Sequence, residues 1–95
     1  MGPIEKRIRD ILTEALAPTR MEVINESHMH AGHAGGSADG SGESHMRVRV
    51  ISHKFDTVSR IQRHRMVNQL LKPVIDDGLH ALAIEPAGTQ DSVRW

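Results

Sequence analysis

The chain has 95 residues, and its 12 Lys and Arg residues balance its 12 Asp and Glu residues, so the formal net charge is zero. This length suits one domain with a modest core, and a neutral chain has no overall field to attract nucleic acid or an anionic membrane. The absence of Cys excludes disulfides and thiolate catalysis, and it leaves His, carboxylates or another molecule's donors as metal ligands. No apolar run approaches the roughly 20 residues that cross a bilayer, and no signal-peptide pattern opens the chain. We therefore expect an intracellular protein that is not secreted, with cytosol, mitochondrion and chloroplast all open.

The first half of the chain predicts a helix, a strand and a long loop. Residues 4–16 carry apolar side chains at helical spacing with charged residues opposite, which is typical of an amphipathic helix, and Pro18 follows its end. From Met21 the apolar residues alternate, so we expect a strand that ends near Ser27. Residues 28–44 combine five Gly residues with His, Ser and Asp, which favours a flexible loop rich in Gly and His.

The sequence after residue 44 predicts a second strand and a second helix. Residues 45–52 alternate Met and Val with Arg, which predicts an antiparallel strand that pairs with the first. A cap at Thr57 or Ser59 is expected to begin a helix that runs through Leu71. The next residue, Lys72, precedes a proline and is therefore disfavoured as a continuation of that helix.

The chain closes with a short helix, a strand and a tail. We expect the short helix at residues 73–77, ended by Gly78, and the strand at residues 79–85. Residues 86–95 are expected to form a loose C-terminal tail. The predicted order is helix, strand, strand, helix, short helix, strand, in a single domain of residues 1–95. Such an αββααβ order indicates an α+β fold, with helices on one face of a small sheet.

Four short motifs add to this order: NES at 25–27, SHM at 44–46, QRHR at 62–65 and HAL at 80–82. Together with the His-bearing Gly-rich loop after the first motif, they closely resemble the BolA family over nearly the whole chain. The loop differs in being longer and richer in Gly and His than is usual. The resemblance implies a three-stranded mixed sheet similar to that of class II KH domains. The GXXG clamp of KH domains is absent, because the junction between the two helices reads LKPV.

The resemblance also implies a function and a site. BolA-like proteins pair with monothiol glutaredoxins, and the heterodimer shares a [2Fe-2S] cluster in iron-sulfur cluster assembly, trafficking or iron and redox sensing. Thiolates come from the glutaredoxin Cys and from glutathione, and the BolA partner supplies the other ligands. Carried onto this sequence, those ligands are His80 and a loop residue, most naturally His30, with His28, His33 and His45 as rivals. The isolated chain is expected to hold no cofactor.

Elementary coordination chemistry agrees with such a shared site. Imidazole is a competent ligand for iron, and two His in place of two Cys on one iron is the Rieske arrangement. Because this chain has no Cys, the thiolates must come from outside, which would make cluster binding and complex formation one coupled event. A ligating imidazole must be neutral, so binding should weaken in acid. His64 lies beside an apolar helix stripe and is expected to pack or to form hydrogen bonds.

An alternative function rests on positive charges on and just after the main helix. Arg60, Arg63, Arg65 and Lys72 could contact phosphates, as a nucleic-acid-binding transcriptional regulator of BolA type would require, or could dock the glutaredoxin. An enzyme is not expected, since no HExxH-like helical pair fixes a catalytic metal.

Overall fold

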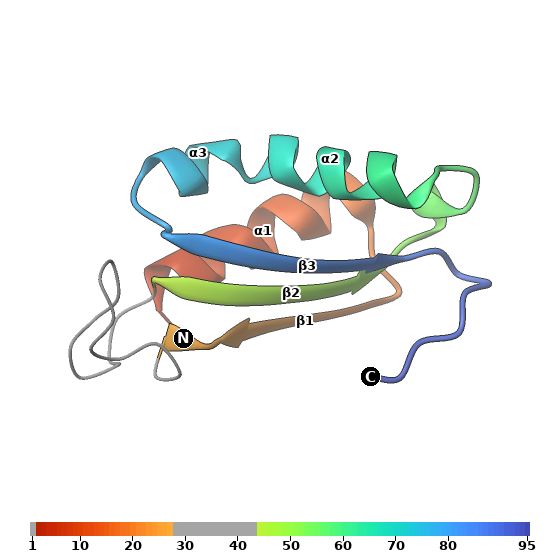
Figure 1. Ribbon diagram of the computed structural model, residues 1–95, viewed down its shortest axis with the longest axis horizontal. Helices are drawn as coiled ribbons and strands as arrows, with labels where there is room; N and C mark the ends of the chain where they lie inside the picture. The colour runs from red at the N-terminus through yellow and green to blue at the C-terminus, as the bar shows by residue number, and fades with distance from the viewer. Residues whose placement is uncertain (1, 28–43) are drawn as a thin grey trace.

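The computed structural model describes residues 2–27 and 44–95, and their elements follow the predicted αββααβ order. These are α1 (Pro3–Leu16), β1 (Arg20–Asn25), β2 (His45–Ile51), α2 (Arg60–Leu70), α3 (Lys72–Asp76) and β3 (Ala81–Ala87). A 3₁₀ helix, η2 (His53–Phe55), follows β2 and was not predicted. The helices lie over one face of the sheet and leave the opposite face open (Figure 1). The expected α+β architecture is confirmed.

The sheet has the order β1-β2-β3 and is mixed, as the resemblance implied. β1 runs antiparallel to β2, with Val23 opposite Val48, whereas β2 and β3 are parallel, with Val48 opposite Ile84. A parallel pair needs a crossover connection, and α2 and α3 provide it. As a result, the end of β1 and the starts of β2 and β3 lie at the same end of the sheet, at the left in Figure 1.

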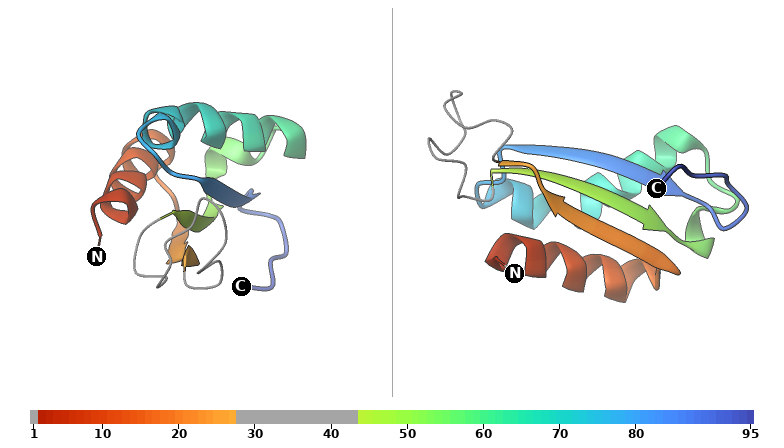
Figure 2. Two further views of the ribbon diagram at one scale, coloured as in Figure 1. Left: turned by 60° about the vertical axis from the view of Figure 1, so that its left-hand side comes forward. Right: turned by 90° about the horizontal axis from the view of Figure 1, so that it is seen from below.

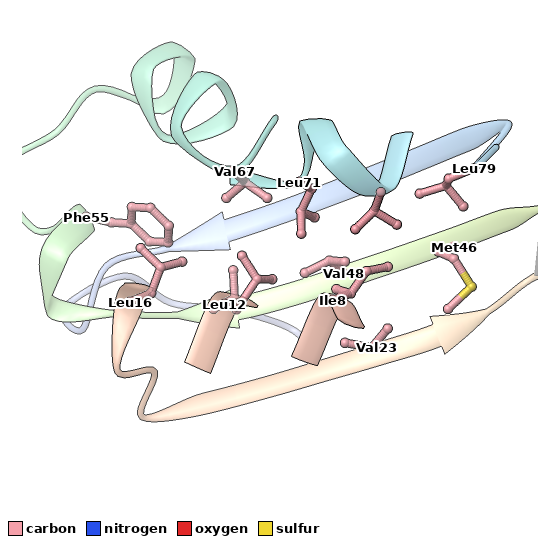
Figure 3. Close-up of a cluster of buried hydrophobic side chains, with 12 residues drawn as sticks. Ile8, Leu12, Leu16, Val23, Met46, Val48, Phe55, Val67, Leu71 and Leu79 are labelled. Atoms are coloured by element: carbon pink, nitrogen blue, oxygen red, sulfur yellow. The ribbon is translucent and has the colours of Figure 1, made fainter. Parts of the chain in front are cut away.

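The core lies between the helices and the sheet (Figure 3). α1 contributes Ile8, Leu12 and Leu16, which are spaced four residues apart and therefore share one face of the helix. The sheet and the remaining segments complete the core with Val23, Met46, Val48, Val50, Phe55, Val67, Leu71, Val74 and Leu79. Burial of an aliphatic side chain of this kind stabilises a fold by about 1.5–3 kcal/mol relative to exposure.

Local signals explain where the helices begin and end. The Ser59 hydroxyl accepts a hydrogen bond from the backbone N–H of Gln62 at 3.3 Å, so Ser59 rather than Thr57 caps α2. Gly78 has φ +125°, a conformation that L side chains rarely adopt, and it follows α3 as expected.

The last strand begins and ends two residues later than the sequence analysis predicted. Leu79 is buried in the core before the strand starts, and His80 immediately precedes it. Pro86 and Ala87, which were assigned to the loose tail, belong to β3, and the Ala87 carbonyl accepts a hydrogen bond from the Ser52 N–H at 3.0 Å. Pro86 is tolerated because β3 is an edge strand, where a missing N–H costs little.

The start of the tail is also fixed rather than loose. The Asp56 carboxylate accepts hydrogen bonds from the Thr89 N–H at 2.6 Å and from its hydroxyl at 2.8 Å. Asp91 accepts a hydrogen bond from the Gly88 N–H at 2.9 Å. A Cβ atom at Gly88 would lie 2.8 Å from Asp56 Oδ1 and 3.3 Å from Asp56 Cα, so a side chain here would have to displace the Asp56 carboxylate from its hydrogen bonds with Thr89. At the end of the tail, the Trp95 ring lies under the guanidinium of Arg20, 5.1 Å from its centroid. The right-hand view of Figure 2 shows the tail passing beside the open face of the sheet.

Candidate metal-ligating site

Two of the candidate histidines meet where β2 and β3 begin. The rings of His45 and His80 are in edge contact, with centroids 5.2 Å apart and planes at 62°. His80 is exposed, whereas His45 is only 8% exposed. His80 immediately precedes β3, and the carbonyl of Ser44 accepts hydrogen bonds from the N–H groups of His80 and Ala81, at 2.9 and 3.0 Å. The position of the His80 backbone is therefore tied to the start of β2.

The NES and SHM motifs form one hydrogen-bonded corner beside these rings. The side-chain oxygen of Asn25 accepts a hydrogen bond from the Ser27 N–H at 2.9 Å, which turns the chain at the end of β1. The buried hydroxyl of Ser27 then accepts a hydrogen bond from the His45 N–H at 3.1 Å. The Glu26 N–H donates to the His45 carbonyl at 2.8 Å. Both serines belong to the family motifs, and short polar residues at strand ends are the sequence signal for this hydrogen-bonding role.

His28, His30 and His33 lie outside the described residues. Within residues 2–27 and 44–95, no group of three or more His, Cys, Asp or Glu side chains could hold a metal ion. Because the whole chain has no Cys, this corner offers imidazole nitrogen but no thiolate. That donor set fits a metal centre that takes its remaining ligands from another molecule.

His64 was predicted to pack or to form hydrogen bonds, and its exposed ring makes hydrogen-bonding contacts. Its Nδ1 lies 2.9 Å from the Arg60 carbonyl oxygen on its own helix, and its Nε2 lies 3.1 Å from the Ile84 carbonyl oxygen. The ring therefore links α2 to the outer edge of β3. A side chain that covers an edge carbonyl also protects the strand against pairing with another chain.

Arg63 was predicted to lie on a surface for a partner or nucleic acid, and this prediction is wrong. The residue is 8% exposed, its Nε donates to the Val58 carbonyl at 2.8 Å, and its guanidinium forms an ion pair with Asp91. The charge is thus neutralised inside the structure. Hydrogen bonds from the Gly88 N–H and from Arg63 lower the pKa of Asp91.

The other three cations of this group are on the surface. Arg60 and Arg65 are exposed on α2, and neither takes part in an ion pair among the described residues. Lys72 is exposed and pairs with Asp76 at 2.8 Å. A usable positive surface on this helix is therefore reduced to two arginines.

The open face of the sheet carries further charges, but they form a ladder of ion pairs. The links are Arg20–Glu22 at 3.0 Å, Glu22–Arg49 at 3.3 Å, Arg49–Glu85 at 2.9 Å, Glu85–Arg47 at 3.2 Å and Arg47–Glu26 at 2.9 Å. Hydrogen bonds from Arg49 and then Arg47 lower the pKa of Glu85. Three arginines alternate with three glutamates, so the ladder itself has no net charge to attract phosphate groups.

None of the helices among the described residues is long and apolar enough to span a membrane.

Similarity to known proteins covers most of the chain. The family model described as "BolA-like protein" matches residues 12–91. An uncharacterised protein from Sinorhizobium sp is 58% identical over 92 residues, which cover 97% of this chain and 94% of that protein. "BolA-like protein 1" from Homo sapiens is 42% identical over 85 residues, covering 90% of this chain and 58% of that protein.

Solved structures agree with the sequence comparisons. BolA1 from Arabidopsis thaliana superposes with a TM-score of 0.83 at 29% identity, covering 98% of this chain and all of that chain (100%). The BolA domain of SufE1 from the same plant gives a TM-score of 0.82 at 36% identity, covering 94% and 95% of the two chains. The family model, the relatives and the fold all lead to one conclusion: this chain belongs to the BolA-like family.

Proposed function

We propose that this protein is a non-enzymatic partner of a monothiol glutaredoxin, with which it forms a heterodimer that shares a [2Fe-2S] cluster. The observation that carries the proposal is the exposed imidazole of His80, held at a fixed corner of the sheet in a chain that contains no Cys. Thiolates from the glutaredoxin Cys and from glutathione would complete the coordination. The role would be in iron-sulfur cluster assembly, trafficking or iron and redox sensing, in an intracellular compartment.

His80 and His30 are the proposed ligands from this chain. Two imidazoles on one iron raise the reduction potential of a [2Fe-2S] cluster relative to ligation by thiolates alone. Neither residue can hold a cluster without outside thiolates, so loading and complex formation are coupled. His28 and His33 remain rivals to His30.

The sheet is hollowed near the residues that follow His80. A hollow of about 250 Å³ lies beside His45 on the open side of the sheet, and the small residues Ala81 and Ala83 form part of its lining. Its rim includes Arg47 and Glu26, which are paired with each other at 2.9 Å. A partner that entered this hollow would meet small side chains and a neutralised ion pair rather than a free charge.

The test is to mix the purified protein with a monothiol glutaredoxin, glutathione and iron-sulfur reagents. We expect a heterodimer whose visible absorption differs from that of the glutaredoxin homodimer. His80→Ala should abolish that difference and His30→Ala should weaken it. The matched control is His53→Ala, because His53 is exposed beyond the far end of β2. A spectrum indifferent to both site variants would contradict the proposal.

Nucleic-acid binding is the weaker alternative. Arg60 and Arg65 remain exposed for phosphate contacts, but Arg63 is buried and the charges of the open face are paired. A regulator of this kind should bind DNA with an affinity that falls steeply with salt, and Arg65→Ala should make that slope shallower. If no binding appears at low salt, the alternative is excluded.

A further inference from the structure

We propose that His45 is a positioning residue, which orients the imidazole of His80 for metal binding and is not itself a ligand. This inference rests on the proposed function and deepens it. Its basis is the contrast between two rings in contact, one nearly buried and one exposed.

His45 is held from several directions. Its Nδ1 lies 2.9 Å from the Ser44 hydroxyl, and its backbone N–H and C=O are both bonded to the end of β1 through Ser27 and Glu26. As the first residue of β2, it is also paired with Ala81 of β3. Such a ring is a rigid part of the sheet end, and at 8% exposure it presents little surface to an iron atom bound on another protein.

His80 has the opposite character. Its side chain is exposed, and without a neighbour it would exchange among rotamers that must be given up when a metal binds. The Ser44 carbonyl holds the His80 backbone through a 2.9 Å hydrogen bond, and the His45 ring lies against the His80 ring, with centroids 5.2 Å apart, where it can restrict the side chain. Both contacts come from adjacent residues of one strand start. Restricting a ligand before binding improves affinity because less rotamer freedom is lost.

Residues that support a metal ligand without touching the metal typically change metal affinity by about 10–100-fold when mutated. Two substitutions of His45 separate this role from direct ligation. His45→Ala removes both the ring contact and any possible nitrogen ligand. His45→Phe removes the nitrogens but keeps a planar ring against His80. A positioning role is therefore retained in the Phe variant, whereas a ligand role is lost equally in both.

The first measurement uses the free protein and needs no cluster. Three-bond couplings across the His80 side chain, measured by NMR, report whether one rotamer is populated. We expect a single rotamer in the wild type and in His45→Phe, and averaging in His45→Ala. Thermal unfolding of both variants identifies any loss of fold, and the Phe variant alone still tests the proposal if the Ala variant does not fold.

The second measurement uses the complex with cluster-loaded glutaredoxin. We expect His45→Ala to raise the dissociation constant about tenfold or more, and His45→Phe to remain close to the wild type with the same number of His nitrogens coupled to the iron. If His45→Phe loses affinity as His45→Ala does, and one nitrogen disappears, His45 is a ligand. If His45→Ala changes neither the His80 rotamer nor the affinity, His45 has no orienting role. Should His80→Ala leave the complex unchanged, the proposed function fails, while the NMR result still decides the positioning role.

Discussion

We expect Arg63→Ala to lower the free energy of unfolding by about 2–3 kcal/mol. If Arg63 instead lay on a binding surface, the substitution would leave stability unchanged. A hydrogen bond to a charged group contributes about 1.5–3 kcal/mol, and Arg63 makes one to the Val58 carbonyl at 2.8 Å. Its ion pair adds less, because the Asp91 side chain is 40% exposed and solvent screens the interaction. The truncation also removes the packed stem of a side chain that is only 10% exposed.

The assay for this prediction is urea unfolding followed by circular dichroism, with thermal unfolding as a second measure. A loss of 2 kcal/mol should lower Tm by roughly 10 °C in a domain of this size. Arg65→Ala is the matched control, since Arg65 lies on the same helix, is exposed and takes part in none of the ion pairs found among the described residues. If Arg63→Ala is as stable as Arg65→Ala, the structural role assigned to Arg63 is incorrect.

Three further predictions concern the tail and the corner of the sheet. Gly88→Ala should destabilise the fold by about 1–3 kcal/mol in urea unfolding, because its Cβ would lie 3.3 Å from Asp56 Cα and 2.8 Å from Asp56 Oδ1 and would push the carboxylate off Thr89; an unchanged midpoint would contradict this reasoning. Hydrogen bonds from the backbone and side chain of Thr89 lower the pKa of Asp56, and the pKa of Asp91 is lowered as well. The stability that these two carboxylates contribute is present above the unfolded carboxyl pKa of about 4 and is lost as pH falls through their folded pKa values. In an acid titration, Asp56→Asn should therefore lose less free energy of unfolding below that pH than the wild type does. Ser27→Ala leaves the His45 N–H without its 3.1 Å partner and should cost about 1–3 kcal/mol, whereas equal stability of the variant in urea would show that this buried hydrogen bond contributes little.

The fold was largely predictable because each element carries its own local signal. The stripe of Ile8, Leu12 and Leu16, the alternation of β2 and the cap at Ser59 each depend on nearby residues alone. The error at β3 has a long-range cause. Leu79 is drawn into the core, and Pro86 is accepted because of the strand's place at the sheet edge, neither of which local alternation reveals.

The candidate site was predictable only in part. His80 could be singled out through the resemblance. Its contact with His45, however, depends on the parallel pairing of β2 with β3, in which His45 lies opposite Ala81, a residue 36 positions later in the sequence. The burial of Arg63 likewise depends on Asp91, which lies 28 residues away in a segment that had been assigned to a loose tail. Charge spacing along a helix cannot distinguish an arginine that faces solvent from one that is paired with a distant segment.

The most direct test of the account is spectroscopy of the assembled heterodimer with this chain labelled with ¹⁵N at His. We predict that pulsed electron paramagnetic resonance of the reduced cluster detects His nitrogen from this chain bound to iron, and that His80→Ala removes one coupling. All-sulfur ligation, with no nitrogen of this chain coupled to the iron, would contradict the proposed site and leave only the fold and the family.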